Sequence, residues 1–414
     1  MDKNEIRRGW PVLLGVTIAM IAGVGTLPYY TAGMFVTSLQ QTFGWSRSAI
    51  SLGPSIFILG LVLTTPLIGS MTDRLDPRKL VVVGVVVVAL SFGGLSVMSG
   101  GIFEYYGALA LMSVLGNLSG ACAVTPILVG SFARSRGAAL GIAMAGIGLG
   151  SAVGGPLVAQ AIATHGWRGG YRAMSAFCFA MAPLIWGLLR CGNWRATVPP
   201  TKVHPGLSVR EALASSTYWY LSTAFFLIAL GSTGLIVHFV PLLTDRGMDA
   251  RAAASVSSTI GLCVIASRLF SGFLVDRLFA PRVAMTIMLT GAAGYVAFVL
   301  GGTRFAYVGA LAVGISFGAE TDLVGFLVAR YFGLRNYGRL FGVMYGLCLS
   351  GTAVSPALYG WVADRMGTYV PMILAAVGLL TAAAWIFAML PPYPRWQNVA
   401  FADASLPGGE PVAP

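Results

Sequence analysis

Charged residues are scarce in this chain of 414 residues. Only 10% of the residues are charged, whereas 57% are hydrophobic, and the mean hydropathy is +0.80. A soluble protein of this size cannot bury so much apolar surface, so the composition indicates an integral membrane protein. The apolar runs are continuous rather than alternating, which argues against a transmembrane β-barrel. The chain also carries 54 glycines, which suit closely packed transmembrane helices.

Groups that carry out chemistry or bind metals are also few. The chain has three histidines and five cysteines, and the cysteines are scattered: Cys122, Cys178, Cys191, Cys263 and Cys348. We expect the cysteines to be packing residues, and we expect no metal site and no cofactor. The sequence has no glycine-rich nucleotide loop, which argues against ATP-driven pumping. It has no nucleophile–base set either, so an enzyme is not expected.

Long apolar runs are what the chain has in abundance. A helix needs about 20 apolar residues to cross a bilayer, and by this measure the sequence divides into twelve predicted spans. Their predicted limits are residues 10–38, 48–70, 79–99, 103–130, 137–161, 170–190, 217–243, 251–274, 281–301, 304–329, 338–360 and 369–391. The sequence therefore predicts an all-α membrane protein with twelve transmembrane helices.

Basic residues outnumber acidic ones by 26 to 14, and their distribution follows the predicted topology. If the N-terminus is cytoplasmic, 18 of the 26 lie in cytoplasmic turns and tails, 7 lie on the opposite side, and Arg268 alone lies inside a span. This asymmetry follows the positive-inside rule, and it predicts a multi-pass protein of the inner cell membrane with both termini in the cytoplasm. The net charge of +12 is thus a matter of topology, and we expect the lipid bilayer, not nucleic acid, as partner.

The two halves of the sequence repeat one another. The segment "GSMTDRLDPRKL", from Gly69, and the segment "GFLVDRLFAPRV", from Gly272, share G-x-x-x-D-R-L at an offset of 203 residues. Such internal symmetry is typical of a transporter whose site lies at the membrane midplane between two bundles. The predicted parts are an N-terminal six-helix bundle (1–190), a cytoplasmic linker (191–216), a C-terminal six-helix bundle (217–392) and a cytoplasmic tail (393–414).

The loop motif resembles the signature of the major facilitator superfamily, G-x-x-x-D-R-x-G-x-R-R/K. It is carried here by Gly69, Asp73, Arg74, Arg78 and Lys79, with an aspartate at the family's usual glycine position. The resemblance implies the major facilitator fold, with two pseudo-symmetric six-helix bundles. It also implies that the acidic and basic loop residues form a latch that closes the cytoplasmic side. The expected latch residues are Asp73, Arg74, Arg78, Asp276 and Arg277. The alternative for these charges is simple anchoring at the membrane surface.

A narrower resemblance is carried by residues 131–150, "SFARSRGAALGIAMAGIGLG". This segment is similar to the corresponding segment of monocarboxylate porters and of the related oxalate/formate antiporters. Where the monocarboxylate family has an acidic-Gly-aromatic motif in helix 1, this chain has "AGVGTLPYYTAG" (22–33).

The buried charges give the predicted substrate site. A charged side chain inside a span is costly, so Arg268 should face a cavity or a partner. Two acids, Glu320 and Asp322, lie inside the tenth predicted span at a depth similar to that of Arg268. In a structural interpretation one of these acids merely neutralises Arg268. In a functional interpretation Arg268 binds the substrate carboxylate and an acid carries protons. The porter families that the chain resembles also have an arginine in helix 8.

Five further residues are candidates, each with a structural alternative. Asn117 lies 203 residues before Glu320, so it is expected to face the same cavity from the other bundle or to hold helices together. Tyr29, Tyr30 and Tyr345 are candidates for substrate contacts or for packing. His238, near the outer end of the seventh span, is a candidate proton relay or a structural histidine.

These observations predict a secondary active transporter of a small organic anion, with a monocarboxylate as the first candidate. Transport would proceed by alternating access in a monomer, with protons as the coupling ion (symport) or a counter-anion in exchange (antiport). A drug or metabolite efflux transporter is the alternative within transport, and a non-transporting membrane receptor is the alternative from another class.

Overall fold

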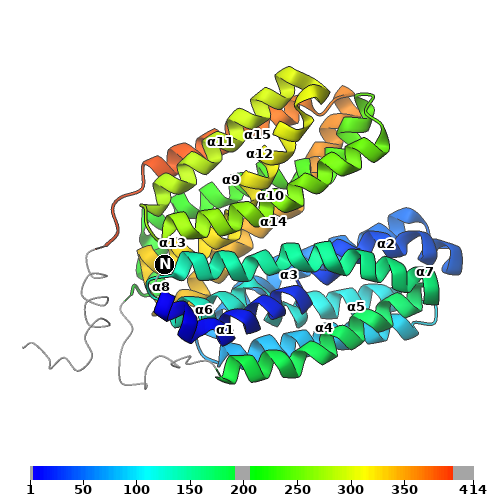
Figure 1. Ribbon diagram of the computed structural model, residues 1–414, viewed down its shortest axis with the longest axis horizontal. Helices are drawn as coiled ribbons and strands as arrows, with labels where there is room; N and C mark the ends of the chain where they lie inside the picture. Colours follow the sequence, from blue (N-terminus) through cyan, green and yellow to red (C-terminus); the bar gives the residue numbers. More distant parts are fainter. Residues whose placement is uncertain (1–2, 192–205, 395–414) are drawn as a thin grey trace, which may run out of the picture.

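The computed structural model describes residues 3–191 and 206–394, and it consists of two helical bundles (Figure 1). The first bundle contains α1 (Lys3–Ala22), α2 (Leu27–Phe43), α3 (Arg47–Thr72), α4 (Pro77–Val97), α5 (Ile102–Val114), the 3₁₀ turn η1 (Gly116–Ser119), α6 (Ala121–Ser131) and α7 (Arg136–Cys191). The second contains α9 (Ser216–Asp245), α10 (Ala250–Val275), α11 (Ala280–Gly301), the 3₁₀ turn η2 (Gly302–Phe305), α12 (Ala306–Gly318), α13 (Glu320–Phe332), α14 (Tyr337–Met366) and α15 (Val370–Ala388). The prediction of an all-helical membrane protein is confirmed.

The number of membrane passes follows from the long helical stretches of the described residues. Nine stretches are long and apolar enough to cross a membrane, and α5 with η1 and α6 forms a tenth, bent by 40°. Two of these stretches reverse direction, one within α7 at Gly166 (φ 69°) and one between α11 and α12 at Gly302 (φ 59°). Glycine is needed at both turns because other residues rarely adopt a positive φ. The described chain therefore makes twelve passes, as predicted.

Three of the spans are broken near their middle. The first span changes direction between α1 and α2, where the hydroxyl of Ser119 accepts a hydrogen bond from the N–H of Val24 (3.1 Å). The fourth span is interrupted by η1, and the tenth is interrupted at Ala319, between α12 and α13. The repeat offset of 203 residues carries Leu115–Asn117 onto Gly318–Glu320, so the fourth and tenth spans break at equivalent positions. Broken helices at midplane are a feature of transporter binding sites.

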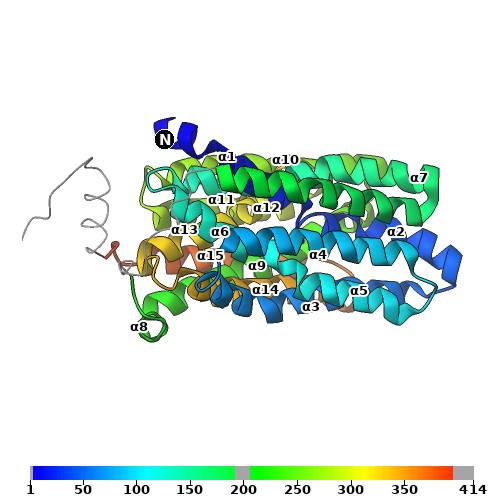
Figure 2. The ribbon, with the colours of Figure 1, turned by 90° about the horizontal axis from the view of Figure 1, so that it is seen from below.

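The bundles meet at one end of the molecule and diverge toward the other (Figure 1). We call the end with the α3–α4 and α10–α11 loops the closed end, and the opposite end, where α7 reverses, the open end. At the closed end α3 packs on α14 and α7 packs on α10. Glycines make this approach possible, because a Cβ at Gly69 would overlap the carbonyl of Gly338 and one at Gly137 would overlap that of Gly272. The second view shows the long helices running side by side (Figure 2).

The described part of the connection between the bundles, from residue 206 onward, contains a short helix. Within the predicted linker 191–216, the short helix α8 (Val209–Ala214) begins with a capping box in which Ser208 and Glu211 satisfy each other's backbone N–H groups. The N–H of Leu207 donates to the carbonyl of Phe332 (2.9 Å), which ties the chain to the α13–α14 loop. Residues 192–205 and almost all of the predicted tail lie outside the described residues.

Candidate functional site

Arg268 lies in the second half of α10 and points into the second bundle, not toward lipid. Its Nη1 donates to Oδ1 of Asp322 on α13 at 2.9 Å, and both side chains are only 4% exposed. A buried ion pair of this kind needs its remaining donors and acceptors satisfied to be stabilising. Here the Nε of Arg268 and the Oδ2 of Asp322 have no hydrogen-bond partner within the described residues. The Arg268–Asp322 ion pair therefore keeps one donor and one acceptor without a hydrogen bond in the described structure.

Glu320 lies at the first position of α13, directly after the helix break. Its Oε1 accepts a hydrogen bond from the thiol of Cys348 on α14, and its Oε2 has no partner among the residues that the structure describes. Asp322 follows in the same first turn, so both carboxylates sit at the positive end of the α13 dipole. The structure thus gives the two acids different partners: Asp322 pairs with Arg268, and Glu320 binds Cys348.

Asn117 lies in η1, at the equivalent break in the first bundle. Its Nδ2 donates to the hydroxyls of Thr64 (3.1 Å) and Thr65 (3.0 Å) on α3, and the side chain is buried. The repeat offset carries Thr65 onto Arg268. The Asn117–Thr65 contact therefore lies at the place in the first bundle that the contact between α13 and Arg268 has in the second, but it carries no charge. This placement favours the helix-holding role for Asn117.

Two of the three candidate tyrosines lie near enough to Arg268 for its charge to act on their hydroxyls. Tyr30 on α2 is 43% exposed, and the charge of Arg268 in the other bundle acts on its hydroxyl. Tyr29 packs edge-on against Tyr30, with ring centroids 5.3 Å apart. Tyr345 on α14 stacks on Phe341, and the charges of both Glu320 and Arg268 act on its hydroxyl. Tyr30 and Tyr345 thus approach the Arg268 cluster from opposite bundles.

His238 lies apart from this cluster. Its Nε2 is 3.0 Å from the carbonyl oxygen of Pro356, and its Nδ1 is 3.4 Å from the hydroxyl of Tyr369 near the open end. The ring also stacks on Tyr359 at 6.4 Å between centroids. These contacts hold α9 against α14, which is the structural role left open for this residue.

The acidic latch residues bind backbone groups across the bundle interface. Asp73, at the end of α3, accepts hydrogen bonds from the N–H of Gly338 (2.7 Å) and of Arg339 (2.9 Å) at the start of α14. In the repeat, Asp276 at the end of α10 accepts from Gly137 (2.7 Å) and from the next residue, Ala138 (2.9 Å), at the start of α7. Each carboxylate thus caps a helix N-terminus of the opposite bundle. Burial raises the pKa of Asp276 above its ordinary value, and the two N–H donors oppose that rise.

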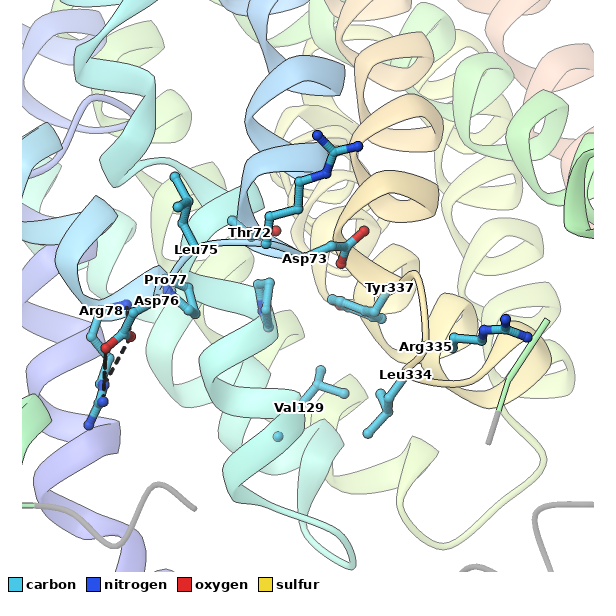
Figure 3. A pocket seen from close by; sticks show the side chains of 13 residues that line it. Thr72, Asp73, Leu75, Asp76, Pro77, Arg78, Val129, Leu334, Arg335 and Tyr337 are labelled. Atoms are coloured by element: carbon cyan, nitrogen blue, oxygen red, sulfur yellow. Dashed lines mark hydrogen bonds and ion pairs between the residues drawn. The ribbon is translucent and has the colours of Figure 1, made fainter. Parts of the chain in front are cut away.

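In the described part of the chain, no ion pair joins the expected basic latch residues to Asp73 or Asp276. Arg78 forms an ion pair with Asp76 in its own loop (2.9 Å), and Figure 3 shows this pair pointing away from Asp73. The guanidinium of Arg277 lies 4.0 Å from the ring centre of Phe273 on its own helix. Arg74 lines, together with Asp73, Arg78 and Arg335, a cavity of about 350 Å³ at the closed end. Of the expected latch residues, Asp73 and Asp276 are therefore the two whose described hydrogen bonds cross the bundle interface.

One set of hydrogen bonds at the closed end was not expected from the sequence. The carboxylate of Glu5 on α1 accepts hydrogen bonds from the N–H groups of Ala133 (2.6 Å) and Ser135 (2.9 Å), just before α7. Arg136 is buried beside it, and its Nε donates to the carbonyl of Phe132 (2.8 Å). No spacing in the sequence signals the Glu5 contact, because it joins residues about 130 positions apart. It fixes the start of α7, the helix that Asp276 caps.

Comparison with known proteins identifies the class. The Major Facilitator Superfamily profile matches residues 12–356 and 223–408. Human monocarboxylate transporter 11 is 24% identical, over 92% of this chain and 83% of the relative, and rat (Rattus norvegicus) monocarboxylate transporter 13 is 25% identical, over 93% and 89%. The Escherichia coli fucose:proton symporter has a similar structure (TM-score 0.73, 14% identity, 92% of this chain and 98% of that chain). So does the human organic anion transporter MFSD10 (TM-score 0.71, 18% identity, 92% and 99%).

The chain belongs to the major facilitator superfamily. It is a multi-pass membrane transporter and not an enzyme, as the sequence predicts.

Proposed function

We propose that this transporter carries a small organic anion, and a monocarboxylate in particular, by alternating access. The observation that carries the proposal is the buried guanidinium of Arg268, which uses Nη1 for Asp322 and leaves Nε without a partner in the described residues. A guanidinium binds a carboxylate through two parallel N–H donors, a strong and geometrically selective contact away from water. The names of the monocarboxylate transporters among its relatives support the same substrate class.

Coupling follows from competition for Arg268. A substrate carboxylate that binds Arg268 takes donors from Asp322, and a buried carboxylate without a partner is strongly disfavoured. Asp322 then becomes neutral by accepting a proton, so one proton accompanies the anion. Glu320, with one oxygen unpartnered in the described structure, is a second proton acceptor two residues away. In exchange mode a counter-anion replaces the substrate at Arg268, and no proton moves.

We propose that the closed end faces the cytoplasm of the inner cell membrane, with both termini on that side, and that the protein works as a monomer. Support comes from the excess of Lys and Arg in the turns of the closed end. In this orientation the molecule is outward-facing: Asp73 and Asp276 hold the cytoplasmic side shut, while the bundles diverge on the other side (Figure 1).

Uptake of a panel of labelled carboxylates into proteoliposomes, with and without a pH gradient, tests the proposal. The Arg268→Lys variant keeps the charge and loses the two-pronged donor, so we expect uptake of the best acid to fall about tenfold or more. Arg304→Lys, an exposed residue of η2 at the open end, is the matched control and should transport normally. Uptake driven by an inward proton gradient indicates symport, and uptake driven only by a preloaded acid indicates exchange.

Near-normal uptake by the Arg268→Lys variant would contradict the docking role. Export of an amphipathic drug that survives Arg268→Ala would favour the efflux alternative instead.

A further inference from the structure

A groove of about 1,040 Å³ runs along the outside of the second bundle, away from the Arg268 pair. It arises because α12 packs closely on both α10 and α11, while α10 and α11 touch each other little. α12 therefore forms the floor of the groove, and the two neighbouring helices form its walls. The volume is at the upper end of that of pockets that bind small molecules.

The lining is apolar in effect, although it includes several hydroxyls. Ser267 donates to the carbonyl of Ile315 (2.9 Å), and Ser271 donates to the carbonyl of Arg268 (3.2 Å). Thr286 and Thr290 likewise donate to carbonyls one turn earlier in α11. The hydroxyl donors of these four residues are therefore already bound to backbone carbonyls. The rest of the lining is mainly aliphatic and aromatic, with Leu269, Phe270, Phe273, Leu278 and Leu311 among it.

The length and position of the groove match one leaflet of a bilayer. Along α10 the lining extends from Cys263, near the middle of the helix, to Leu278 beyond its closed end. The twelve residue steps from Cys263 to the helix end at Val275 cover about 18 Å at 1.5 Å per step, and the lining continues past that end to Leu278. Half of a bilayer, with its hydrocarbon and headgroup regions, is about 20–22 Å thick. A lipid chain can therefore lie in the groove with its headgroup at the closed end.

Positive charge lies at that headgroup end. Arg282 lines the groove in the first turn of α11, and Arg277 lies in the loop that precedes it. Both are exposed, and each rests near an aromatic ring, Arg282 at 6.0 Å from Phe279 and Arg277 at 4.0 Å from Phe273. Neither has a carboxylate partner within the described ranges. The neighbouring Asp276 is committed to the backbone of α7.

From this geometry we propose that the groove between α10, α11 and α12 binds a phospholipid with an anionic headgroup. Its phosphate lies at Arg277 and Arg282, and one acyl chain lies along α10. Basic residues at this level attract anionic headgroups, and a pocket of fixed shape adds selectivity to that attraction. The bound lipid supports the face of α10 opposite Arg268, and it holds the segment that ends in Asp276.

Native mass spectrometry of the full chain, purified with equimolar dioleoyl phosphatidylglycerol and dioleoyl phosphatidylcholine, tests this proposal. We expect one tightly retained phosphatidylglycerol per protein. Arg277→Gln and Arg282→Gln should each weaken its retention about fivefold, and the double variant about 25-fold. Arg190→Gln is the matched control, because Arg190 also stacks on an aromatic ring, Trp186 (4.7 Å), and is not a groove residue.

A second variant tests the acyl-chain part of the site. Thr290→Trp fills the inner end of the groove at an exposed position, so it should reduce retention of both lipids without touching the arginines. Melting curves of each variant in lipid-free detergent check that the fold is intact, and the single variants carry the test if the double variant is unstable. Equal retention of the two lipids by the unmodified protein would overturn the proposal. So would a phosphatidylglycerol preference that persists in the double variant, or an equally large loss in Arg190→Gln.

Discussion

Removal of Asp322 offers the sharpest test of how the buried charge of Arg268 is held. The two side chains are 4% exposed and 2.9 Å apart, so solvent screens them little. At an effective dielectric constant of about 20 their attraction is about 6 kcal/mol before desolvation is counted. Measured losses on removing one partner of such a pair are about 3–5 kcal/mol, because the other charge is left buried and alone. We expect Asp322→Ala to fall in this range.

The assay is reversible unfolding in mixed detergent micelles, compared across a double-mutant cycle. Asp322→Ala alone should shift the unfolding equilibrium by a factor of about 100 or more. Combining it with Arg268→Met removes the orphaned charge as well, so most of the lost stability should return. If Asp322→Ala is as stable as the unmodified protein, Arg268 is solvated in some other way, and the competition between Asp322 and a substrate carboxylate has no basis.

Three further predictions concern the latch, the glycine contacts and the first-bundle break. Asp73→Asn weakens the hydrogen bonds to α14 by about 1–2 kcal/mol. Thiol probes at the closed end should therefore react about tenfold faster. Arg78→Gln should leave the reaction rate unchanged, because Arg78 pairs with Asp76 in its own loop. Gly69→Leu should keep the closed end from forming, which spin-label distances across that end would detect. Gly187→Leu should leave those distances unchanged, because a side chain at Gly187 meets open space. Unchanged distances in Gly69→Leu would contradict the role of close packing. Asn117→Ala should lower the melting temperature through the loss of two hydrogen bonds to α3, about 1–3 kcal/mol, yet leave the KM for substrate unchanged; a raised KM would restore Asn117 as a substrate ligand.

The fold could be predicted because its signals are long and redundant. Apolar runs, the charge asymmetry and the repeat all depend on many residues, so single errors do not matter. Span limits were less certain where helices extend beyond the hydrocarbon core. The first span starts at Lys3, seven residues before its predicted limit, and α14 continues to Met366 instead of 360. Hydropathy marks only the part of a helix that lies in lipid.

The structure pairs Arg268 with one of the two acids that the sequence places at its depth, and local geometry decides which one. Depth arithmetic placed Arg268 level with the two acids, but it assumed a continuous helix. The break at Ala319 changes the phase of the residues that follow, so the choice of Asp322 over Glu320 could not be made from helical spacing. Arg78 binds within its own loop for a similar local reason. Asp76 lies two residues away and forms the nearest possible ion pair, which local geometry favours over a partner across the interface.

Within the described residues, the carboxylates of Asp73 and Asp276 accept hydrogen bonds only from backbone amides of the facing helices. These hydrogen bonds come from the main chain, so a change of side chain at a position such as Ala138 leaves the donor in place. The contact does require that the facing main chain has an N–H group to donate and can come close to the carboxylate. A proline at Ala138 removes a donor, and a bulky residue at Gly338 or Gly137 forces the helices apart. The contact can thus persist in a related chain while the side chains around it change.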